Sequence, residues 1–181
     1  MIISVEELRK YITTDLDDSV LEAKLQAIES MVRKRTNNTF TMRNYRFRCQ
    51  IIAQKIFIKL GDIPGLLNVG DTVQITSSMY NDGVYTIKSI EDDSIIELDK
   101  LLIDESEVVI AKVVYPADVK MGVVELMKWD LETGAKAKAG IQSETISRHS
   151  VTYVDTSSDS FYMGYPKSKL GFLTHYMKAR F

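Results

Sequence analysis

The chain has 181 residues, 45% of them apolar and 27% charged, and a formal net charge of −2. This composition excludes a disordered chain and is typical of one globular domain, or of one domain that carries a smaller insert. The single cysteine excludes a disulfide framework within the chain, no apolar run approaches the roughly 18 residues of a membrane span, and the slight net acidity disfavours general attraction to nucleic acid.

The first predicted element is a short helix over residues 5–12. Ser4 and Glu7 have the spacing of a capping box, in which the serine side chain accepts a hydrogen bond from the backbone three residues on. Residues 1–7 lack the basic stretch and apolar run of a secretory signal, so none is expected here.

A longer second helix is predicted to begin near residues 17–19 and to end at about Thr36. One apolar stripe runs along it at helical spacing, made by Leu21, Leu25, Ile28 and Val32. Ser19 and Glu22 have the spacing of a second capping box. The pair Asn37-Asn38 is expected to end the helix.

Residues 41–114 are rich in β-branched and aromatic side chains and lack helical periodicity. Alternating runs predict strands over residues 46–48, 55–59, 72–76, 84–90, 95–98 and 108–115. The sequence Asn-Asp-Gly at residues 81–83 is typical of a tight hairpin turn. Short strands at this spacing predict a small barrel or a curled sheet.

A third helix is predicted after Pro116, which suits a first helical turn, and Gly134 is expected to end it. Its apolar stripe consists of Val119, Val123, Leu126 or Met127, and Leu131. A short extended segment follows over residues 150–154. A final helix is predicted from near Pro166 toward Phe181. The predicted fold class is therefore α+β: a small core of three to four helices, formed by residues 1–40 and 115–181, with an inserted barrel-like β domain over residues 41–114.

The sequence predicts no catalytic residue, no metal site and no cofactor, and it favours a protein that is not an enzyme. No paired Cys or His has metal-ligand spacing, and the glycines match no phosphate-binding loop. His149 stands between two serines, but adjacency in sequence is not the convergence in space that nucleophilic catalysis requires.

A nucleic-acid-binding module is the alternative function. The β-rich segment holds aromatic and basic residues that could stack on bases and contact phosphates. They are Tyr45, Phe47, Phe57, Tyr80, Tyr85, Arg43, Arg46 and Arg48. Against this alternative, the segment has 8 basic and 11 acidic side chains.

Several stretches together resemble a known family. They are Ser-Val-Glu-Glu-Leu-Arg-Lys-Tyr-Ile at residues 4–12, the helix that follows, Tyr-Pro-Ala-Asp-Val-Lys at residues 115–120, and Ser-Glu-Thr-Ile-Ser-Arg-His-Ser-Val-Thr-Tyr at residues 143–153. The chain resembles the head–tail connector (adaptor, or head-completion) proteins of long-tailed double-stranded DNA bacteriophages over residues 4–40 and 115–181. Simple members are shorter and helical, and the insert resembles small barrels of some phage connectors through residues 69–75 and 81–87.

The resemblance implies a structural subunit of the virion neck that is assembled in the host bacterial cytoplasm. Such subunits form a ring, commonly twelve-fold, beneath the portal protein. The ring extends the channel through which double-stranded DNA passes without sequence-specific binding, and it offers a surface to the next neck (stopper) protein. No membrane is involved.

The resemblance also suggests interface residues. The portal-interface candidates, on a basic C-terminal helix, are Lys167, Lys169, Leu170, Leu173, Tyr176, Met177, Arg180 and Phe181. The ring or lumen candidates are Lys136, Lys138, Glu144, Ile146, Arg148, His149, Val151 and Tyr153. For both sets the alternative is packing within the subunit itself.

Overall fold

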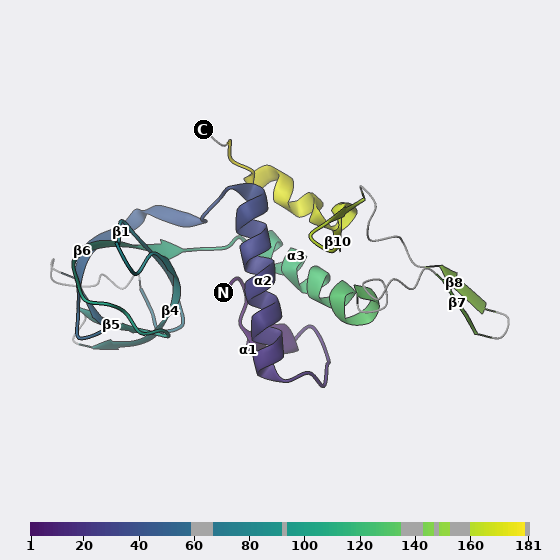
Figure 1. Ribbon diagram of the computed structural model, residues 1–181, viewed down its shortest axis with the longest axis horizontal. Helices are drawn as coiled ribbons and strands as arrows, with labels where there is room; N and C mark the ends of the chain where they lie inside the picture. The colour runs from purple at the N-terminus through teal and green to yellow at the C-terminus, as the bar shows by residue number, and fades with distance from the viewer. Residues whose placement is uncertain (59–66, 92–93, 135–142, 147–148, 153–159, 180–181) are drawn as a thin grey trace. The chain divides into compact units, whose positions relative to one another are not determined.

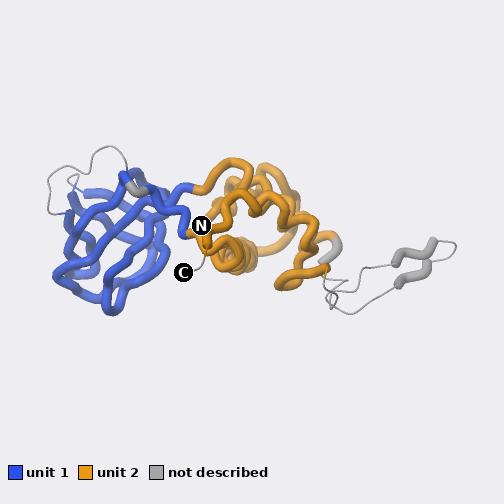
Figure 2. The backbone as a smooth tube through the Cα atoms, turned by 90° about the horizontal axis from the view of Figure 1, so that it is seen from above, with its two compact units in different colours: residues 1, 39–114 blue, residues 2–38, 115–181 orange. Residues whose placement is uncertain are grey.

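The computed structural model describes residues 1–58, 67–91, 94–134, 143–146, 149–152 and 160–179. The chain divides into two compact units (Figure 2). One unit consists of Met1 and residues 39–114, and the other consists of residues 2–38 and 115–181. We call them the barrel unit and the helical unit. Together they confirm the predicted mixed α+β class with a barrel-like part.

The barrel unit is a closed barrel of six antiparallel strands, which Figure 1 shows as a ring of ribbons. The strands are β1 (Thr41–Ile52), β2 (Lys55–Ile58), β3 (Thr72–Thr76), β4 (Gly83–Glu91), β5 (Ile95–Leu98) and β6 (Glu105–Val113). Their order around the barrel is β1-β2-β5-β4-β3-β6, and β6 closes the barrel by pairing with β1. Closure leaves the sheet without free edges.

The interior of the barrel is filled by aliphatic side chains. The fully buried ones include Ile51, Ile56, Val73, Ile75, Ile87, Ile96, Val108 and Ile110. Cys49 lies in this core. Burial raises the pKa of its thiol to about 12. The described strands of the barrel therefore share one hydrophobic core.

The helical unit is built on α1 (Val5–Arg9), α2 (Asp18–Thr36) and α3 (Ala117–Trp129) (Figure 1). The predicted stripes form its core: Leu21, Leu25, Ile28 and Val32 on α2 and Val119, Val123, Leu126 and Met127 on α3 are all buried. The last turn of α3 widens into a π-helical segment, η1 (Asp130–Gly134). Buried Asp130 forms an ion pair with Lys24 of α2 and so joins the two long helices.

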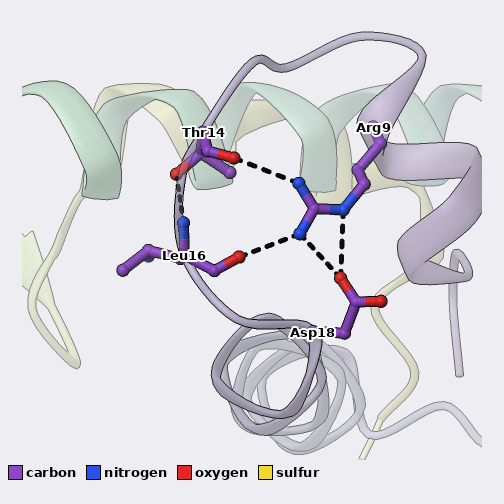
Figure 3. A network of polar contacts seen from close by, with 4 residues as sticks. All are labelled: Arg9, Thr14, Leu16 and Asp18. Carbon is purple, nitrogen blue, oxygen red and sulfur yellow. Dashed lines mark hydrogen bonds and ion pairs between the residues drawn. The ribbon is translucent and has the colours of Figure 1, made fainter.

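The first helix is shorter than predicted, and Arg9 at its end binds the connection that follows. Ser4 Oγ accepts from the N–H of Glu7 as expected, but α1 ends at Arg9. The Arg9 guanidinium donates to the carbonyl oxygens of Thr14 and Leu16 at 3.0 and 2.8 Å and to the carboxylate of Asp18 (Figure 3). These bonds hold residues 10–17 as an ordered connection. Since α2 already begins at Asp18, the capping box predicted for Ser19 does not form.

Three short pieces complete the helical unit. The strands β7 (Ser143–Ile146) and β8 (His149–Thr152) pair with each other, as do β9 (Phe161–Tyr162) and β10 (Tyr165–Pro166). The β9–β10 hairpin packs on Trp129 of α3, whose ring centroid lies 6.1 Å from that of Phe161 and 5.7 Å from that of Tyr165. A 3₁₀ helix, η2 (Lys167–Tyr176), follows.

The C-terminal helix predicted from near Pro166 is present, but it is shorter than predicted. It is a 3₁₀ helix that ends at Tyr176, and Met177 is extended. The end of α2 holds the chain beyond it. Lys178 donates its N–H to the carbonyl of Thr36 at 2.7 Å, and the side chain of Asn37 donates to the carbonyl of Ala179 at 2.9 Å. With three residues per turn, Leu170, Leu173 and Tyr176 recur on one side of η2.

Candidate interaction surfaces

The predicted portal-interface residues divide into a buried group and an exposed group. Leu170 and Leu173 are fully buried in the core of the helical unit. The hydroxyl of Tyr176 donates to the carboxylate of Asp118 on α3 at 2.8 Å, which raises the pKa of the phenol. Leu170 and Leu173 therefore pack within the subunit and offer no apolar surface in this conformation, whereas Tyr176 is bonded to α3 but remains partly exposed.

The exposed group is basic. Lys167, Lys169 and Lys178 are exposed, and so is Met177. The sequence holds no acidic residue from Ser160 to Phe181. The predicted candidates Arg180 and Phe181 lie outside the described residues. We call residues 167–179 the basic tail. Since its backbone is bonded to the end of α2, the basic tail presents its lysines from a fixed support.

The predicted ring or lumen residues fall on or beside the β7–β8 hairpin. The backbone register pairs Glu144 with Val151 and Ile146 with His149, so four candidates form two alternate cross-strand pairs. Lys136, Lys138, Arg148 and Tyr153 lie outside the described residues. Among the described strands, β7 and β8 pair only with each other. A hairpin of two strands is marginally stable in water, so this one requires further contacts.

The outer side of the barrel does not favour the nucleic-acid alternative. Four of its cations are neutralised by carboxylates, in the pairs Arg48–Glu107, Lys55–Glu91, Lys88–Glu97 and Lys112–Asp71. Phe47 and Tyr85 pack partly against the barrel core. Arg46 is exposed, and the side chain of Arg43 lies outside what the structure describes. The carboxylates beside these cations lower the positive potential that a phosphate backbone would meet there.

A surface that the sequence analysis missed lies at one end of the barrel. The β1–β2 turn, the β3–β4 loop and the β5–β6 loop all meet there, opposite the end where β1 begins and β6 ends. Gln54 of the turn donates its N–H to the carboxylate of Asp104 in the β5–β6 loop at 3.3 Å. We call these three connections, residues 53–54, 77–82 and 99–104, with the flanking Ile52 and Glu105, the loop end.

Asn81 and Glu105 form the framework of the loop end. Asn81, 3% exposed, donates to the carbonyl of Ile103 at 2.8 Å and accepts from the N–H of the same residue at 2.8 Å. The two bonds mimic a pair of strand hydrogen bonds and join the β3–β4 loop to the β5–β6 loop. The tight turn predicted at residues 81–83 is therefore wrong: Asn81 is a buried anchor in a longer loop.

The carboxylate of Glu105 accepts hydrogen bonds from several groups of the β3–β4 loop. Its carboxylate accepts from the N–H of Met79 at 2.7 Å and of Tyr80 at 3.2 Å, and it also bonds the hydroxyl of Ser78 and the amide of Asn81. The hydroxyl bond of Ser78 is the main reason that the pKa of Glu105 lies below its ordinary value. An ionised Glu105 thus organises the loop by charge-assisted hydrogen bonds.

This framework holds large apolar side chains out in water. Leu101 is 83% exposed, Met79 80%, Tyr80 63%, Ile103 56% and Ile52 49%. Leu102, which stands between the exposed Leu101 and Ile103 in the sequence, is buried in the barrel core. A cluster of exposed apolar residues on ordered loops marks an interaction site more often than a single exposed leucine does. The apolar run Leu-Leu-Ile at residues 101–103, outside any predicted strand, was the signal in the sequence.

Acidic residues lie in the same loops as the exposed apolar side chains. The loop end contains Asp82, Asp99, Asp104 and Glu105 and a single cation, Lys100. Lys100 Nζ lies 5.9 Å from the ring centroid of Tyr85. Apolar anchors inside a charged rim are the usual composition of a protein–protein interface.

Comparison with protein-family models and with curated proteins found no match to this sequence. Within the described part of the chain, no group of three or more His, Cys, Asp or Glu side chains is placed to hold a metal ion. None of the described helices combines the length and the apolar character that crossing a membrane requires.

Proposed function

We propose that the protein is a structural subunit of a phage neck, one that forms an oligomeric ring beneath the portal and joins the DNA-filled head to the tail. The resemblance described above suggests this role. The observation that carries it is the β7–β8 hairpin. Within the stretch of most specific resemblance, residues 143–153, the described residues 143–146 and 149–152 form a two-stranded sheet that pairs with no other described strand.

A hairpin that pairs with no other described strand suits a ring subunit. Both of its outer edges carry backbone N–H and C=O groups that a strand of a neighbouring copy can pair with. Pairing around a closed ring would satisfy these edges in every subunit, and no edge would remain for uncontrolled aggregation.

The charge distribution of the described surface agrees with a DNA channel. Each phosphate that a protein neutralises releases counterions and strengthens binding, so a channel wall with few free cations lets DNA slide. The net charge of −2 and the paired cations of the barrel fit that requirement. A protein that binds a specific base sequence would instead need a surface rich in cations that can contact phosphates.

The experiment is electron microscopy of the full chain mixed with the portal protein of the same genome. We expect additional ring density at one face of the portal. Val151→Pro removes one N–H of β8 and should abolish the ring, because proline cannot donate in a sheet. Val151→Thr is the matched control at the same position; it keeps the N–H and the β-branched shape and should keep the ring.

Circular dichroism and thermal unfolding of both variants should match the wild-type chain, since the barrel and the helices do not depend on β8. A portal that gains no density with the wild-type chain would refute the neck function. A ring that forms equally with Val151→Pro would refute the role of the hairpin.

A further inference from the structure

The loop end and the basic tail are complementary in charge and in chemistry. The loop end presents five exposed apolar side chains with four carboxylates and one lysine. The basic tail presents Lys167, Lys169 and Lys178 with no acidic residue, and Met177 there is 48% exposed. Methionine is flexible and adapts well to an apolar partner surface.

We propose that the loop end of one copy binds the basic tail of a second copy. This inference rests on the proposed ring, and it names one contact within that ring. It also reassigns the exposed lysines of the tail from the portal to the neighbouring subunit.

Both surfaces are already built for binding. The Asn81 bridge and the Glu105 carboxylate fix the backbone beneath Met79, Tyr80 and Ile103. The bonds from Thr36, Asn37 and Asn38 fix the backbone of the tail. Loops that are ordered before binding lose little conformational entropy when they bind.

The contact uses two different surfaces, so it is heterologous. Each copy carries one loop end and one tail, and head-to-tail contacts of this kind close into a ring or extend into a filament. An isologous dimer, in which the same patch meets itself, would bring four carboxylates against four carboxylates and is disfavoured by like-charge repulsion. The charge distribution therefore favours head-to-tail assembly over a symmetric pair.

The test is sedimentation velocity of the full chain, without portal, at concentrations up to the millimolar range and at low ionic strength. The loop-end variant is Tyr80→Ser/Leu101→Ser, and the tail variant is Lys167→Glu/Lys178→Glu. We expect concentration-dependent association of the wild-type chain, weakened by added NaCl. In either variant we expect a dissociation constant at least about tenfold larger.

Mixing the two variants gives the sharpest result. Each retains the surface that the other has lost, so the mixture should form dimers and nothing larger, while each variant alone stays monomeric. Val69→Ser, an exposed apolar residue elsewhere on the barrel, and Lys10→Glu/Arg46→Glu, with the same change in charge, are the controls and should associate like the wild-type chain.

Three outcomes would overturn the inference: a wild-type chain that is monomeric at millimolar concentration, a loop-end variant that associates normally, or a mixture that stays monomeric. If the double loop-end variant does not fold, Leu101→Lys alone, at a side chain that is almost wholly in water, replaces it. Head-to-tail association without any ring on the portal would sustain this contact and refute the neck function, so the two failures are distinguishable.

Discussion

A β-carbon at Gly122 of α3 would stand 2.5 Å from the ring of Phe172 in η2, well inside van der Waals contact. The ring of Phe172 in the C-terminal element therefore lies directly against the bare backbone of α3 at Gly122. This close approach lets Leu170 and Leu173 reach the core between the helices, and it explains why the C-terminal element is part of the fold.

Gly122→Ala tests that approach. Alanine gains about 1 kcal/mol of helix propensity over glycine, but forcing a methyl against an aromatic ring costs about 1–3 kcal/mol. We expect a net loss of stability in urea unfolding, partly recovered when Phe172→Leu is added. Gly171→Ala in η2 is the matched control, because a β-carbon there meets nothing within 4 Å, and its midpoint should be unchanged or slightly higher.

Leu173→Ala should destabilise the isolated subunit by about 2–5 kcal/mol, since it removes a fully buried side chain and leaves a cavity. Met177→Ala, at the exposed end of the same element, should change the free energy of unfolding by less than about 0.5 kcal/mol. Equal and small effects of the two changes in thermal unfolding would mean that the C-terminal element does not belong to the core.

The Glu105 framework predicts a dependence on acid. The hydrogen bond from Ser78 lowers the pKa of Glu105 from an ordinary value of 4.5. The stabilisation by its carboxylate is therefore fully present above about pH 4.5 and is lost as the pH falls through the folded-state pKa.

Glu105→Gln should lower the thermal midpoint most at neutral pH, and the difference from the wild-type chain should shrink below pH 4.5. Glu6→Gln, at an exposed position of α1, is the control and should give a much smaller difference at neutral pH. A difference for Glu105→Gln that stays constant across this range would show that the charge of Glu105 does not organise the loop end.

Cys49 should be chemically inert while the barrel is folded. Its thiol is 1% exposed, and burial holds its pKa at about 12 against an ordinary 9.0, so almost no thiolate exists at pH 8. A thiol-specific disulfide reagent should react only as fast as the barrel opens, and at once in denaturant. Because the folded-state pKa is raised, the contribution of this neutral thiol to stability is fully present below pH 9.0 and is lost as the pH rises toward 12.

Local patterns in the sequence were enough to predict the position of α2, its buried face and most strands of the barrel. The stripe Leu21, Leu25, Ile28 and Val32 identified α2 and its buried side, because the helical period places such residues on one face regardless of what covers it. Alternating apolar residues and turn signals likewise located the strands of the β-rich segment, and their number and spacing indicated a barrel.

The tertiary structure decided what those patterns leave open. Asn81 looked like a turn residue, yet the nearness of Ile103, 22 positions away, makes it a buried bridge. The tail looked like an exposed amphipathic helix. In the structure its backbone is hydrogen-bonded to Thr36 and Asn37, more than 140 positions away, and the ring of Phe172 packs against Gly122. Periodicity reports only neighbours along the chain, whereas these bonds join segments that meet only after folding, so no local signal could have revealed them.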